Sequence, residues 1–89
     1  MMIIYDPQNR HFRWQYEINQ DEYVVIDYSR PRWDYEACAS AFKADARGKI
    51  VEWTTLAQCF DFEEDPLAAR KNCEAQLREK GFKLKTPSW

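Results

Sequence analysis

Three segments in the first third of the chain show the hydrophobic pattern of strands. Between residues 12 and 18, aromatic and aliphatic residues alternate with polar ones, in the order FRWQYEI. A period of two is typical of an antiparallel strand with one buried face. Residues 2–5 (MIIY) and 22–28 (EYVVIDY) are rich in β-branched and aromatic residues, and turn-forming residues separate the three segments. The pattern therefore predicts three strands in meander order.

The next segment shows helical spacing. Pro31 has no backbone N–H to donate to a sheet, so the third strand is expected to end near Arg30. Asp34 suits a helix N-cap, and Gly48 suits a left-handed C-cap. Between them, apolar residues recur at the spacing of one helical stripe: Tyr35, Cys38, Ala39, Phe42 and Ala46. These features predict a helix over residues 35–46.

Further strands are expected in the second half of the chain. Residues 49–53 (KIVEW) predict a fourth strand, and residues 54–55 are either a tight turn or a continuation of it. Residues 56–62 (LAQCFDF) favour a fifth strand, with a helical turn as the alternative. Residues 82–85 (FKLK) alternate and predict a last edge strand.

A second helix is expected between these strands. Asp65 suits its N-cap and Pro66 its first position, while Lys80 and Gly81 mark its end. The residues expected on its buried side are Leu67, Ala69, Cys73 and Leu77, with Ala68 and Gln76 as further candidates.

Together these elements predict an α+β fold for one domain over residues 1–89. We expect an antiparallel sheet of about five to six strands with two helices on one face, in the order βββα-ββα-β. The order strand, helix, glycine, strand occurs twice. The chain is therefore also interpreted as two unequal pseudo-repeats, residues 1–48 and 49–89.

The composition narrows the classes of function. Aromatic residues make up 16% of the chain, which suits a small core built from rings. The net charge is −2 and the basic residues are not clustered, so nonspecific binding to a phosphate backbone is disfavoured. No apolar run reaches the ~20 residues that span a bilayer, and the three cysteines fit neither a disulfide framework nor a metal motif. We expect a cytoplasmic protein without a cofactor, a bound metal or a membrane partner.

The residue types that carry chemistry are interpreted as structural. The single histidine, His11, is expected in a surface turn, and Cys38, Cys59 and Cys73 are expected to fill the core. The acidic residues of segment 61–65 are expected at a solvated helix start. The sequence contains no glycine-rich phosphate loop and no nucleophile elbow. It therefore predicts a protein without enzymatic activity.

Residues 12–48 resemble the repeat unit of the YegP-like family, which consists of small proteins of unknown function. The resemblance rests on Phe12-Arg13-Trp14, Asn19, Glu36-Ala37-Cys38 and Ala44-Asp45-Ala46. The chain departs from the family pattern in its 19–21 turn, which lacks glycine, and at residues 30–33, where Arg-Pro-Arg-Trp replaces a Gly-Tyr pair. The resemblance implies units of three strands plus a helix, followed by a strand, that share one sheet within the chain or by strand exchange in a dimer. It implies no catalytic residue.

The strongest candidate binding surface combines arginine with aromatic residues. Arg30, Arg32 and Trp33 form a corner outside the periodic elements, and Tyr35 follows at the start of the predicted helix. Arg13 lies among the aromatic residues of the 12–18 strand. For Trp33, capping the core at the helix start is the alternative role. Arginine and aromatic side chains dominate protein-interface hot spots and also form base-stacking platforms.

We therefore expect a small non-catalytic interaction module that binds another protein through this corner or through a sheet edge. Single-stranded nucleic acid is the alternative ligand. The aromatic content and the strand exchange implied by the resemblance lead us to expect a homodimer as well.

Overall fold

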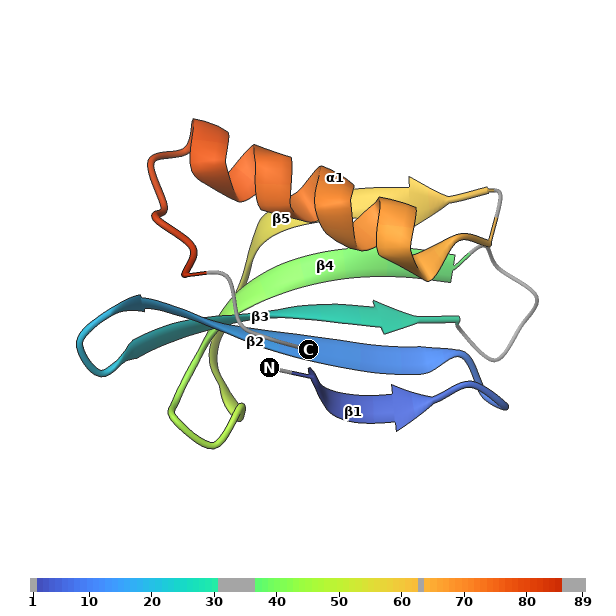
Figure 1. The fold of residues 1–89 in the computed structure, drawn as a ribbon, viewed down its shortest axis with the longest axis horizontal. Helices are drawn as coiled ribbons and strands as arrows, with labels where there is room; N and C mark the ends of the chain where they lie inside the picture. The colour runs from blue at the N-terminus through green and yellow to red at the C-terminus, as the bar shows by residue number, and fades with distance from the viewer. Residues whose placement is uncertain (1, 31–36, 63, 86–89) are drawn as a thin grey trace.

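The computed structural model describes residues 2–30, 37–62 and 64–85, and these residues form one sheet and one helix (Figure 1). Each strand pairs with the next in antiparallel fashion. The strands are β1 (Met2–Asp6), β2 (His11–Asn19), β3 (Glu22–Ser29), β4 (Ala37–Ala44) and β5 (Ile50–Asp61). The helix α1 (Pro66–Glu79) covers one face of the sheet, over β3, β4 and β5. The α+β class and the antiparallel sheet are confirmed.

The meander of the first three strands is also confirmed. Trp14 lies opposite Ile26 and Tyr16 lies opposite Val24, and all four side chains are buried. They belong to the main core, which α1 completes with Ala69, Cys73 and Leu77. The alternating pattern of β2 thus matches its two faces, because its aromatic side chains point toward the helix and its charged side chains point toward the opposite face of the sheet.

The helix predicted over residues 35–46 is wrong, because Ala37–Ala44 form strand β4. Residues 31–36, with the expected N-cap Asp34, lie outside the described residues. Ala39 and Ala41 are buried on the helix side, while Cys38 and Ser40 face the other way. Alanine has a high helix propensity, but the hydrogen-bonded pairing of β4 with both β3 and β5 outweighs it here. The small alanines also let α1 approach the sheet closely.

The two strands predicted over residues 49–53 and 56–62 are one long strand, β5. Residues 54–55 continue it, so neither the tight turn nor the helical turn forms. The pairing with β4 is irregular, because Ala41 lies opposite Ala57 but Lys43 lies opposite Glu52. β5 therefore holds extra residues at this point, and such a bulge bends a strand.

The second predicted helix is confirmed as α1. The Asp65 side chain accepts a hydrogen bond from the Ala68 N–H at 3.2 Å, and Pro66 occupies the first turn. The helix is capped at Lys80 and is followed by Gly81 at a φ of 95°. Of the residues expected on its buried side, Leu67 and the further candidate Ala68 are exposed instead.

The sixth strand predicted at residues 82–85 does not form, so the order βββα-ββα-β is wrong. The segment nevertheless runs beside β2, where the Lys85 N–H donates to the Glu17 carbonyl at 3.1 Å. Phe82 and Leu84 pack against the main core. The apolar positions of this segment are therefore used for packing without a full strand ladder.

The tip of the β4–β5 hairpin folds over the face of the sheet opposite α1 (Figure 1). Two β2 side chains hold it there. Arg13 Nη1 donates to the Gly48 carbonyl at 3.4 Å, and Gln15 Nε2 donates to the Asp45 carbonyl at 2.8 Å. A second, smaller core beneath the tip joins Val25, Ala44 and Ile50 with Ile3, Tyr23 and Phe42. The tip therefore covers one end of this face.

Candidate binding site

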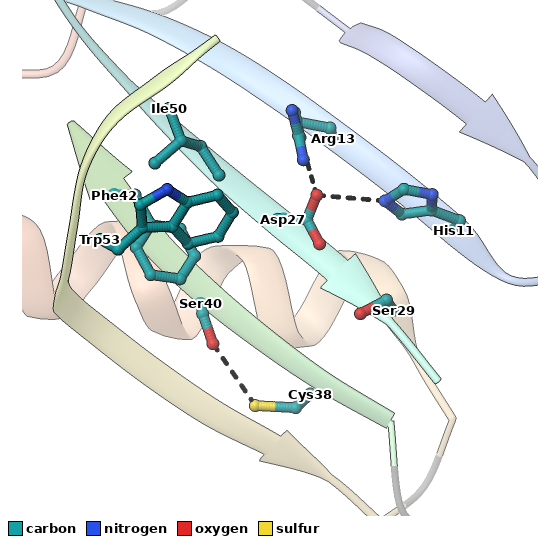
Figure 2. A pocket seen from close by; sticks show the side chains of 9 residues that line it. All are labelled: His11, Arg13, Asp27, Ser29, Cys38, Ser40, Phe42, Ile50 and Trp53. Atoms are coloured by element: carbon teal, nitrogen blue, oxygen red, sulfur yellow. Dashed lines mark hydrogen bonds and ion pairs between the residues drawn. The ribbon is translucent and has the colours of Figure 1, made fainter. Parts of the chain in front are cut away.

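A pocket of ≈ 380 Å³ lies on the sheet face opposite α1, next to the hairpin tip (Figure 2). We call it the open-face pocket. Side chains from β2, β3, β4 and β5 line it: His11, Arg13, Asp27, Ser29, Cys38, Ser40, Phe42, Ile50 and Trp53.

Strand register explains why these side chains meet. Arg13 lies opposite Asp27 in the β2–β3 pair, and Asp27 lies opposite Ser40 in the β3–β4 pair. Residues directly opposite each other point to the same face of a sheet, so a polar row crosses three strands. The bend in β5 then brings Trp53 against Phe42, with ring centroids 5.3 Å apart.

The polar floor of the pocket is organised around Asp27. Arg13 Nε donates to Asp27 Oδ2 at 2.7 Å, and His11 Nε2 lies 3.1 Å from the same oxygen. The Asp27 and Arg13 side chains are only 15% and 21% exposed, which strengthens their attraction compared with a surface pair. The prediction that His11 is a surface turn residue is wrong, because His11 begins β2 and pairs with a half-buried carboxylate.

Cys38 lines the pocket and is half-buried, so its assignment to the core is wrong. Its thiol lies 3.6 Å from Ser40 Oγ and accepts from Gln58 Nε2 at 3.5 Å. The other two cysteines lie on the helix side of the sheet. Burial raises the pKa of Cys73 to about 12 and also raises the pKa of the half-buried Cys59. Both thiols are therefore protonated at neutral pH.

Two exposed aromatic residues lie on the face of the sheet that holds the pocket, and one of them, Trp53, lines the pocket itself. Trp53 is 72% exposed, and Phe60 is 56% exposed. Phe60 lies directly opposite Cys38 in the β4–β5 pair, so its side chain is on the same face as the pocket. We call Trp53 and Phe60 the aromatic rim.

The structure describes only two of the residues predicted to form the binding site, Arg13 and Arg30. Arg32, Trp33 and Tyr35 lie outside the described residues. Arg30 is exposed and forms an ion pair with Glu64, whose carboxylate also lies 3.6 Å from Arg10 Nη1. Arg30 therefore ties the end of β3 to the start of α1. Arg13 belongs to the pocket.

The sequence interpretation missed most of the pocket. Ser29, Ser40 and Trp53 were not singled out, because nothing local in the sequence shows that they meet. Asp27 could have been identified from the sequence, because it is a charged residue inside the β-rich run EYVVIDY. A carboxylate at such a position needs a cationic partner on a neighbouring strand.

The acidic segment 61–65 is not simply a solvated helix start. Asp61 is buried and accepts a hydrogen bond from the Tyr28 hydroxyl at 2.6 Å. Burial and this hydrogen bond raise the pKa of Tyr28 above its ordinary range. Within the described residues, no three His, Cys, Asp or Glu side chains are placed to hold a metal ion.

The outer edge of β5 is covered where it passes α1. Gln76 donates to the Gln58 carbonyl at 2.8 Å and accepts from the Gln58 N–H at 3.3 Å. Lys80 donates to the Leu56 carbonyl. These bonds occupy backbone groups that a partner strand would otherwise use.

No family model, curated protein or solved structure matches the chain. The YegP-like assignment therefore stays a prediction, although the helix that it implies over residues 35–46 is replaced by β4. None of the helices among residues 2–30, 37–62 and 64–85 has the length and apolar character needed to cross a membrane.

Proposed function

We propose that the protein is a small non-catalytic interaction module that binds another protein through the open-face pocket and its aromatic rim. The observation that carries this proposal is Trp53, an aromatic side chain that is 72% exposed beside a pocket of ≈ 380 Å³. Trp is the residue most enriched at interface hot spots, which form where an aromatic anchor is desolvated beside a pocket.

The covered edge of β5 favours binding by the face over binding by strand addition. A partner strand would have to displace Gln76 and Lys80 from the backbone of Gln58 and Leu56. The face opposite α1 needs no such displacement, because the aromatic rim is already exposed there. Exposed apolar side chains that gather on one surface mark sites of protein contact.

The contacts in the pocket support a binding role over a catalytic one. A cysteine or serine nucleophile needs a base in hydrogen-bond contact. Among the described residues, Cys38 contacts Ser40, Gln58 and the Ala39 carbonyl, while His11 contacts Asp27. The imidazole and the thiol thus belong to separate pairs.

Single-stranded nucleic acid remains the competing ligand. It would need arginines that are available to phosphate. The two described arginines of the predicted site are instead engaged by carboxylates, Arg13 by Asp27 and Arg30 by Glu64. This arrangement favours a protein partner.

Photocrosslinking in native lysate tests the proposal. Benzoylphenylalanine replaces Val51, an exposed residue of β5 close to Trp53, or the equally exposed Tyr5 of β1 as a control. We expect a discrete protein adduct from position 51 only, and Trp53→Ala or Phe60→Ala in the same chain should remove it. An adduct that persists in both variants, or equal adducts from both positions, would contradict the proposal.

The same experiment separates the competing ligands. An adduct destroyed by nuclease would support nucleic acid instead of a protein. An adduct with the mass of two chains would identify a second copy as the partner. Light scattering at micromolar concentration then checks whether the purified protein is a dimer.

A further inference from the structure

We propose that the open-face pocket receives a neutral aromatic side chain with a hydroxyl group, namely a tyrosine of the partner protein. This inference rests on the proposed protein-binding function and adds the chemistry of the bound group. Charge, hydrogen-bonding capacity and shape lead to it independently.

The charge of the pocket favours a neutral ligand. Asp27 and Arg13 are joined at 2.7 Å, and their formal charges cancel. A charged ligand group entering this partly buried space would lose hydration and meet no net opposite charge. A neutral polar group avoids that loss.

The hydrogen-bonding groups of the pocket favour a hydroxyl. Asp27 Oδ2 accepts the bonds from Arg13 and His11, whereas Asp27 Oδ1 and Ser29 Oγ have no hydrogen-bond partner among the described residues. Figure 2 shows Ser29 beside Asp27 on the floor of the pocket. A phenol hydroxyl is both a donor and an acceptor. It can donate to Asp27 Oδ1 and accept from Ser29 Oγ, and both groups would be left unsatisfied beneath a phenylalanine.

The wall of the pocket favours an aromatic ring. Phe42 and Trp53 lie at an interplanar angle of 59°, and Trp53 keeps most of its surface exposed. Tilted and offset ring contacts stabilise a bound ring beyond the effect of burial alone. The volume of ≈ 380 Å³ is near the lower end of the ~300–1,000 Å³ of ligand pockets, which suits one side chain.

Capped tripeptides of sequence Gly-X-Gly test the inference, with X as Tyr, Phe, Lys or Glu. Binding to the full chain is followed by NMR, through the backbone amide signals of Cys38 and Ser40. We expect saturable shifts with the Tyr peptide and at least about tenfold weaker binding of the Phe peptide, since one hydrogen bond is worth about a factor of ten. Equal binding of the Phe peptide, or tighter binding of the Lys or Glu peptide, would overturn the inference.

Three variants assign the preference to the pocket. Ser29→Ala should reduce the preference for Tyr over Phe while Phe binding is kept. Trp53→Ala should weaken both peptides, and Tyr5→Ala, which removes an equally exposed ring elsewhere, should change neither. A preference that survives Ser29→Ala, or binding that survives Trp53→Ala, would overturn the inference.

The outcomes also separate this inference from the function on which it rests. Crosslinking through position 51 without Tyr-peptide binding would overturn the tyrosine assignment and leave the protein-binding function standing. Absence of both would overturn both.

Discussion

At the residue scale, Tyr28 and Asp61 form a hydrogen bond between two buried side chains. Tyr28 is fully buried, and its hydroxyl donates to Asp61 at 2.6 Å from the middle of the main core. β3 and β5 are thereby connected across β4. A buried carboxylate that accepts such a bond is stable only while the donor is present.

We predict that Tyr28→Phe lowers the free energy of unfolding by about 1–3 kcal/mol, because it leaves the Asp61 carboxylate unsatisfied. Urea denaturation followed by circular dichroism measures the change. The matched control is Tyr23→Phe, since Tyr23 is half-buried on the opposite face and has no hydrogen bond through its hydroxyl within the described part of the chain. Equal losses in the two variants would show that the Tyr28 hydroxyl has no special role.

At the element scale, β4 shows why the sequence pattern was ambiguous. Ala39, Phe42 and Ala46 match a helical stripe, but Ala37, Ala39 and Ala41 equally match one face of a strand. Alanine fits both readings, and only the pairing with β3 and β5 decides between them. Strands with large alternating residues, such as β2, and the helix with strong caps, α1, were predictable because their signals are local.

The candidate site was less predictable for the same reason. Arg13 was identified, but its partner Asp27 belongs to another strand, and Trp53 reaches the pocket only through the bend in β5. Cross-strand partners and bulges depend on register, which one segment of sequence does not specify.

We predict that Ala41→Leu destabilises the protein by about 1–3 kcal/mol or more, because β4 and α1 leave no room for a larger side chain. The same change at Ala46, an exposed position after β4, should alter stability by less than about 0.5 kcal/mol. Thermal unfolding of both variants checks the contrast. A tolerated Ala41→Leu would contradict the close packing of β4 against α1.

The edge of β5 gives a second prediction at this scale. Gln76→Ala removes the side chain that occupies both backbone groups of Gln58, so we expect a loss of about 1 kcal/mol and concentration-dependent self-association. Sedimentation velocity measures the association. Lys71→Ala, another exposed position on α1, should leave the protein unchanged. A Gln76→Ala protein that behaves like this control would show that the edge is protected by other means.

At the scale of the whole molecule, the two faces of the sheet have opposite characters. The helix side buries the Tyr16, Tyr28 and Cys73 side chains, and burial raises the pKa of each. The other side keeps an ion pair and the aromatic rim accessible. Stability should therefore respond to high pH through the helix side, while binding depends on the open side.

The sign of that response follows from proton binding. In the unfolded chain a cysteine loses its proton near pH 8.5, whereas folded Cys73 keeps its proton until about pH 12. Between these values the folded state binds more protons than the unfolded state, so the free energy of unfolding falls as pH rises. The stabilisation that the protonated Cys73 thiol contributes is complete only below the pKa of a cysteine in the unfolded chain. We predict that urea midpoints decline between pH 8 and pH 11 and that Cys73→Ala makes the decline shallower. The control is Cys38→Ala, which alters a thiol on the open face and should leave the dependence of the urea midpoint on pH unchanged. If Cys73→Ala also leaves that dependence unchanged, the buried thiol is not the group that couples folding to alkaline pH.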